Sequence, residues 1–128
     1  MKEFAVATNV YAAAKARATV ADWIPGHPRL DDVKHVLSEL INNVVVHGRL
    51  PGGSRLVVRM LENRDQLRFE VVYPNTNETR HSRPQRVQSS RGYGLRIVDQ
   101  LVDEWGVEAS PDRVIDWFEI ELRTFQDH

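Results

Sequence analysis

The sequence predicts an α+β fold, a two-layer α/β sandwich with helices on one face of a mixed, largely antiparallel sheet. Three observations support this prediction. Runs of alternating apolar residues occur near both ends and in the middle of the chain, runs with helical spacing lie between them, and Gly, Pro or Asn residues mark most of the boundaries. The expected order is strand, helix, helix, two strands, loop, helix and two strands.

The boundaries of these elements follow from local signals. Asn9 is expected to cap the alanine-rich first helix, Pro25 to end it, and Gly48 to be the C-cap residue of the second helix. The expected elements are a strand at 4–7, helices over about 10–24 and 30–46, strands at 55–60 and 67–73, a loop over 74–91, a helix near 95–102, and strands at 105–109 and 114–123.

Composition excludes several classes of protein. The 128 residues have room for one domain, expected over 1–128, and the Lys and Arg total of 17 nearly cancels the Asp and Glu total of 18. A dedicated nucleic-acid binder would carry a basic excess. The chain has no cysteine, which excludes disulfides, thiolate zinc sites and a cysteine nucleophile. Its apolar runs are too short for a signal peptide or a membrane span, so we expect a cytoplasmic protein.

The second predicted helix carries polar residues opposite its apolar stripe. At 100° per residue, Asn43 lies about 40° from Glu39, one turn further along the same face. From the residues alone, this face is either solvated or part of a site. His35 and His47 are three turns apart and no further ligand completes a set, so zinc is not expected. The apolar stripe consists of Val33, Leu37, Leu40, Ile41 and Val44.

A second signal is the run Ser89-Ser-Arg-Gly-Tyr-Gly-Leu95, where a polar loop enters the third predicted helix. Glycines at a helix start allow a phosphate to approach backbone amides and the positive end of the helix dipole. The alternative is a flexible loop with ordinary helix-start glycines. The arginines that suit an anion here are Arg80, Arg83, Arg86 and Arg91.

Taken together, Glu39-Leu-Ile-Asn-Asn43 and Arg91-Gly-Tyr-Gly-Leu95 resemble, in order and spacing, two boxes of the GHKL (histidine kinase/gyrase-like) ATPase superfamily. The likeness is closest to the anti-sigma factor serine/threonine kinase-like, stand-alone ATP-binding regulators of actinobacteria. The likeness covers nearly the whole chain, and the segments that carry it are residues 37–48, 92–107 and 116–120. The resemblance implies a Bergerat-type ATP-binding fold.

The resemblance also implies roles for individual residues. Asn43 matches the ligand of the Mg²⁺ ion that bridges the ATP phosphates, and Glu39 matches the general base. Gly92 and Gly94 match the glycines that border the phosphates, and the loop 74–91 matches the lid over ATP. The remaining nucleotide contacts that we expect are His47, Asn75, Arg91 and Leu95.

The sequence departs from the family at one position. Tyr73 stands where the family has an aspartate that accepts a hydrogen bond from the adenine amino group, and Asn75 and Asn77 are the candidates to offer a carbonyl oxygen instead. Two functions therefore remain open. One is an ATP-dependent regulator that binds a sigma factor or similar partner and phosphorylates an antagonist protein. The other is a module of the same fold that binds a partner without nucleotide chemistry. Neither involves nucleic acid or a membrane directly, and a homodimer remains open.

Overall fold

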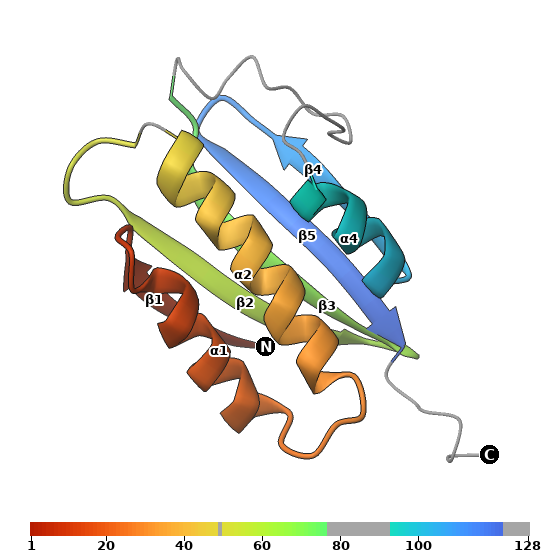
Figure 1. Cartoon of the computed structure of the whole chain (residues 1–128). Helices are drawn as coiled ribbons and strands as arrows, with labels where there is room; N and C mark the ends of the chain where they lie inside the picture. Colours follow the sequence, from red (N-terminus) through yellow and green to blue (C-terminus); the bar gives the residue numbers. More distant parts are fainter. Residues whose placement is uncertain (49, 77–92, 122–128) are drawn as a thin grey trace.

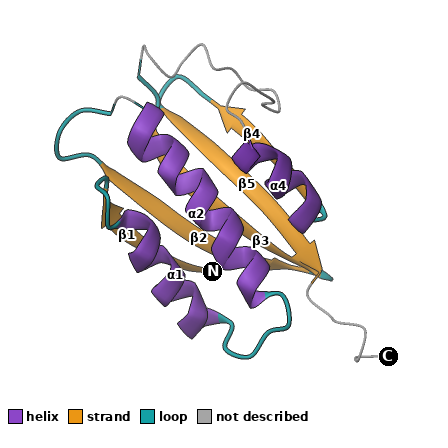
Figure 2. Ribbon diagram, viewed as in Figure 1, coloured by secondary structure: helices purple, strands orange, loops and turns teal. Residues whose placement is uncertain are grey.

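The computed structural model describes residues 1–48, 50–76 and 93–121. It shows two layers, a five-stranded sheet and a layer of helices that covers one face of it (Figures 1 and 2). The expected sandwich is thereby confirmed. The elements are β1 (Lys2–Ala7), α1 (Ala12–Trp23), α2 (Leu30–His47), β2 (Arg55–Asn63), β3 (Gln66–Pro74), α4 (Tyr93–Leu101), β4 (Glu104–Ala109) and β5 (Arg113–Glu121).

The strand order is β1-β2-β3-β5-β4, and each of the four pairings between described strands is antiparallel. The prediction of a mixed sheet is therefore wrong for these strands. The chain leaves β3, passes through α4 and enters β4, which runs parallel to β3. Such a crossover could have made a parallel pair. It does not, because β5 folds back from β4 and inserts between the two.

The core lies between the sheet and the helices. Phe69 and Phe118 on neighbouring strands are fully buried, and their rings stack with centroids 5.1 Å apart. The apolar stripe of α2 is buried over them as predicted, and Val36 joins it. Among the described helices none is long and apolar enough to cross a membrane.

Two helices start away from the expected residues, and α4 begins at Tyr93, two residues earlier than expected. α1 begins at Ala12, two residues later than expected, because the Asn9 carboxamide oxygen accepts the backbone N–H of Tyr11 at 2.8 Å. That contact is a local turn in which the Asn side chain substitutes for a backbone carbonyl. The chain after α1 turns through Gly26, whose φ of +77° suits a residue without a side chain.

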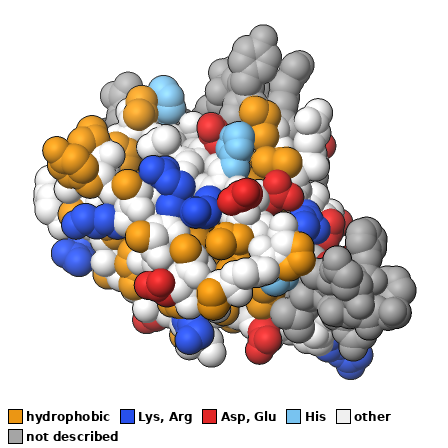
Figure 3. All heavy atoms as spheres, turned by 60° about the horizontal axis from the view of Figure 1, so that its bottom comes forward, with side chains coloured by type: hydrophobic (Ala, Val, Ile, Leu, Met, Phe, Trp, Pro, Cys, Tyr) orange, Lys and Arg blue, Asp and Glu red, His pale blue; other side chains and the backbone are white. Residues whose placement is uncertain are grey.

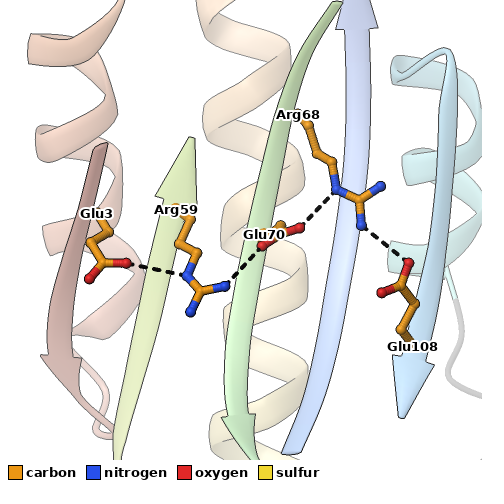
Figure 4. A network of polar contacts seen from close by, with 5 residues as sticks. All are labelled: Glu3, Arg59, Arg68, Glu70 and Glu108. Carbon is orange, nitrogen blue, oxygen red and sulfur yellow. Dashed lines mark hydrogen bonds and ion pairs between the residues drawn. The ribbon is translucent and has the colours of Figure 1, made fainter. Parts of the chain in front are cut away.

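The outer face of the sheet carries a charged network that reaches both edge strands (Figure 4). Glu70 on β3 is 7% exposed and accepts hydrogen bonds from Arg68 at 2.8 Å and Arg59 at 3.4 Å. The two arginines extend the network outward, to Glu3 on β1 and Glu108 on β4, each at 3.3 Å. Every charge in it thus faces an opposite charge across the strands.

Arg68 is the best-held cation of this network. Its guanidinium lies 4.4 Å from the ring centroid of Trp117. Burial lowers the pKa of Arg68, the hydrogen bonds and negative charges of Glu70 and Glu108 raise it, and the net change is a rise. The side chain therefore stays charged at physiological pH.

Candidate functional site

The polar face of α2 is arranged as its periodicity predicts. Glu39 is a third exposed, and its carboxylate lies 3.8 Å from Nε2 of His35, one turn earlier. Asn43, one turn later, is half-buried, whereas His47 in the last turn is exposed. Leu40 and Ile41 between them anchor the helix in the core. The carboxylate and the carboxamide are therefore presented together on a rigid element.

Helix α4 lies beside α2 and is attached to it at one end (Figure 1). Arg29, just before α2, donates from Nη2 to the carbonyl of Leu101 at 2.7 Å, at the C-terminus of α4. It also lies near two carboxylates, with Nε 3.2 Å from Asp32 and Nη1 4.0 Å from Asp103. A cation suits this position because the last carbonyls of a helix carry its negative dipole end.

The sheet beneath these helices presents a buried carboxylate that the sequence reasoning did not single out. Asp116 on β5 is 8% exposed, and the Tyr73 hydroxyl on β3 lies 3.2 Å from each of its two oxygens. Asp116 pairs in register with Val71, a core residue, so its side chain points to the helices. The available signal was a charge in the otherwise apolar alternation of Val114, Phe118 and Ile120.

Asn75, expected to contact a nucleotide, lies just after β3. Its carboxamide donates to the carbonyl of Ser110 at 2.7 Å, and its backbone N–H donates to the carbonyl of Asp112 at 3.1 Å. The structure therefore places Asn75 against the turn between β4 and β5.

The other expected contacts are only partly within the described chain. Gly94 and Leu95 lie in the first turn of α4. Arg91, Gly92 and Asn77 lie outside the described residues, as do residues 77–91 of the predicted lid. The loop arginines that sequence reasoning linked to a phosphate, Arg80, Arg83 and Arg86, lie outside them too.

The structure also shows hollows away from this site. One, of about 360 Å³, is lined by the end of α1 and by strand residues that include Met60 and Leu67. Another, of about 440 Å³, lies between α1 and the edge strand β1. Figure 3 brings the α1–α2 end of the molecule forward, and on that face basic, acidic and apolar side chains are interspersed. This face is thus not a uniform basic surface.

A helix layer on an antiparallel sheet, with Glu39 and Asn43 on a helix beside α4, defines a class of protein. The chain belongs to the histidine kinase-like ATPase domain family, whose profile matches residues 5–115. The expected GHKL resemblance is confirmed. ATP with Mg²⁺ is the ligand general to this family of ATPase domains.

The chain is also similar to individual proteins. The chain is 27% identical over 111 residues to an anti-sigma F factor of Bacillus licheniformis, a match that covers 76% of this chain and 75% of that protein. Its fold is similar to the crystal structure of the RsbU and RsbW domains of a Mycobacterium tuberculosis protein, with a TM-score of 0.64 and 19% identity. That match covers 94% of this chain and 32% of the other, so the chain spans about a third of that solved protein.

Proposed function

We propose that the chain is an ATP-dependent anti-sigma regulator that binds a sigma factor or a similar partner and transfers the γ-phosphoryl group of ATP to a Ser or Thr of an antagonist protein. The observation that carries the proposal is the placement of Glu39 and Asn43 on one face of α2, beside α4. The similarity to an anti-sigma F factor supports the choice of partner. Such a regulator would act in the cytoplasm.

The donor set of α2 fits a magnesium ion. Mg²⁺ takes hard oxygen ligands, keeps several waters, and is bound by few protein groups when phosphates are present. The half-buried carboxamide of Asn43 supplies a neutral oxygen of this kind. When bound, Mg²⁺ would neutralise charge that develops on the phosphates.

Glu39 would act on the attacking hydroxyl. Its carboxylate is a third exposed, so a substrate side chain can reach it. It would accept the proton while the hydroxyl oxygen bonds to the γ-phosphorus and the bond to the departing ADP oxygen breaks. Backbone amides at Gly92 and Gly94, with Arg91, would hold the phosphates at the start of α4. His47 and Leu95 would complete the contacts with the nucleotide.

Calorimetry with Mg-ATP tests the binding part of this proposal. Saturable binding below millimolar that is lost in Asn43→Ala is the expected result, because the variant lacks the metal ligand. Val46→Ala, an exposed position on the same helix, is the matched control and should bind as the unaltered chain does. If no heat of binding were measured at high ATP concentration, the proposal would be contradicted. The alternative function, a module that binds a partner without nucleotide chemistry, would then be favoured.

Transfer from ATP labelled on its γ-phosphate to a co-purified antagonist tests the chemical part. Glu39→Gln should retain ATP binding and lose transfer by about 10²–10⁴-fold, the usual contribution of a general base. If Glu39→Gln transferred phosphate at the rate of the unaltered chain, Glu39 would not be the general base. A pull-down of sigma-like and antagonist proteins with and without ATP tests the partners.

A further inference from the structure

The edge strand β1 presents backbone groups along the open side of the sheet (Figure 1). Thr8 donates its backbone N–H to the carbonyl of Ser54 at 3.3 Å, directly beyond the last register pair of β1 and β2. Residues that bond to the neighbouring strand alternate with residues that do not along an antiparallel pair. The even-numbered residues of β1 therefore bond to β2, and Glu3, Ala5 and Ala7 direct their N–H and C=O groups away from the sheet.

This edge has few of the features that usually protect an edge strand. Such strands are commonly blocked by charged residues, by proline or by bulges. β1 is charged only at Lys2 and Glu3, and the four residues Phe4–Ala7 include no charge and no proline. Arg55 of β2 reaches the edge and donates from Nη2 to the carbonyl of Ala5, but that contact is long, at 3.4 Å. The outward N–H groups are thus placed to bond to a further strand.

A hollow of about 440 Å³ opens beside this edge, between β1 and α1. It is lined by Phe4–Ala7 of β1, by Lys15, Ala18 and Thr19 of α1, and by Arg55. The side chains of Ala18 and Thr19 are small, so the hollow has room for side chains of a strand that pairs with β1. Apolar surface continues from the strand into the turn before α1, where Val10 and Tyr11 are 78% and 65% exposed.

The hollow carries positive charge that the described residues do not compensate. Lys15 and Arg55 are exposed, and neither forms an ion pair within residues 1–48, 50–76 and 93–121. Glu3, the acidic residue of β1, is held by Arg59 at 3.3 Å. A second copy of the chain, docked symmetrically, would bring its own Lys15 and Arg55 to the same interface, and like charges disfavour that contact. An acidic partner suits the edge better.

We propose that β1 is a docking edge for an extended, acidic segment of another protein, which pairs with β1 as an additional strand. The backbone of the segment bonds to the outward groups of Glu3, Ala5 and Ala7, and its carboxylates meet Lys15 and Arg55. Strand addition takes its affinity from main-chain hydrogen bonds and its specificity from pockets for alternate side chains. β1 and β4 are the opposite edges of the sheet, so this surface is separate from the proposed nucleotide site beside α4.

An NMR titration with two capped heptapeptides tests the proposal, one alternating Val with Glu and the other alternating Val with Lys. The Glu peptide should bind about 5-fold more tightly or better, and added salt should reduce the difference. Bound peptide should slow hydrogen exchange at the amides of Glu3, Ala5 and Ala7. Exchange at Phe4 and Val6 should not change, because these residues already bond to β2. That alternation distinguishes strand pairing from general adsorption of the peptide.

Two variants test the backbone and the charge separately. Ala5→Pro removes one outward N–H and keeps the hydrogen bonds to β2, so it should prevent binding of the Glu peptide and leave exchange in β3 and β5 unchanged. Lys15→Gln should weaken binding of the Glu peptide about 2- to 5-fold. Arg64→Gln, at an exposed cation in the turn between β2 and β3, is the matched control and should bind as the unaltered chain does.

Three results would overturn the proposal. The first is equal affinity for the two peptides, and the second is slowed exchange that does not alternate along β1. The third is slowed exchange at Glu3, Ala5 and Ala7 in peptide-free protein as its concentration rises, which would assign the edge to a second copy. The peptide comparison uses the unaltered chain, so it decides the question even if Ala5→Pro does not fold. These measurements contain no nucleotide, so their outcome is independent of the proposed function.

Discussion

Two carboxylates, Glu70 and Asp116, are buried on opposite faces of one sheet. Glu70 faces two arginines within hydrogen-bond distance, and Asp116 faces a tyrosine hydroxyl. Burial alone does not distinguish them, because both are less than a tenth exposed. The burial of Glu70 is compensated by the two arginines that hold it.

At this scale we predict that Glu70→Gln destabilises the fold by about 1–3 kcal/mol. The substitution leaves Arg59 and Arg68 without their shared carboxylate. The cost stays below that of a fully buried pair because their side chains are 24% and 21% exposed. Urea unfolding measures the change. Glu3→Gln removes a 48% exposed partner of Arg59 and should cost less than about 1 kcal/mol. Equal losses of stability in Glu70→Gln and Glu3→Gln would contradict the stronger role of the buried carboxylate.

Residues differ in how far the sequence alone could place them. Glu39 and Asn43 share a helix, so the 3.6-residue period is enough to put them on one face. Asp116 and Tyr73 are 43 positions apart, and their contact depends on β3 lying next to β5. Local patterns carry no information about that pairing, so the sequence did not predict the contact between Tyr73 and Asp116.

At the scale of elements, α4 depends on a residue outside it. Arg29 satisfies the carbonyl of Leu101 in the last turn of α4 and links it to the start of α2. A nine-residue helix is too short to be stable by itself. Its position therefore rests on this contact and on the packing of residues such as Val98.

We expect Arg29→Ala to release the C-terminal turn of α4 at a cost of about 1–2 kcal/mol, because a charge-assisted hydrogen bond is lost. Hydrogen exchange should accelerate at the amides of α4 and remain unchanged in the central strands. The control is Arg55→Ala, which removes an exposed and longer hydrogen bond, 3.4 Å, to the carbonyl of Ala5. Uniform acceleration across the chain would instead indicate global destabilisation.

Element boundaries were less predictable than the elements. α2 and the hairpin of β2 and β3 follow closely from periodicity and turn residues. α1 starts later than expected because Asn9 uses its side chain in a local turn rather than as a helix cap. Both outcomes satisfy a backbone N–H, and the sequence does not distinguish them.

At the scale of the whole molecule, the core depends on an aromatic pair that joins two strands. Phe69 and Phe118 occupy directly opposed positions of β3 and β5, and both are fully buried beneath the helices. β5 joins the edge strand β4 to the rest of the sheet. The pair thus connects the two parts of the sheet that flank α4 in sequence.

We predict that Phe69→Ala costs about 3–5 kcal/mol, a large share of the 5–15 kcal/mol typical of a folded domain. Thermal unfolding followed by far-UV circular dichroism measures the loss. Phe4→Ala is the comparison, because Phe4 is half-buried at the edge and packs edge-on against Trp23. Phe4→Ala should destabilise the fold by less than half as much as Phe69→Ala. A similar loss of stability in the two variants would mean that packing at the edge strand contributes as much as packing in the central core.

The direction of the strands was the part of the architecture that local signals could not supply. Helices and strands alternate in a way that suits parallel or antiparallel neighbours. The insertion of β5 between β3 and β4 makes the strand pairs antiparallel. This insertion is a property of the assembled sheet and is not encoded in any local sequence pattern.

The charged network on the outer face has a consequence for the response of the molecule to salt. The side chain of its central carboxylate, Glu70, is 9% exposed, whereas the side chains of Glu3 and Glu108 at its two ends are 48% and 58% exposed. Mobile ions screen exposed pairs far more than buried ones. Rising ionic strength therefore weakens first the ion pairs that Glu3 and Glu108 make at the edge strands β1 and β4. The ion pairs of Glu70 in the middle of the sheet are weakened least.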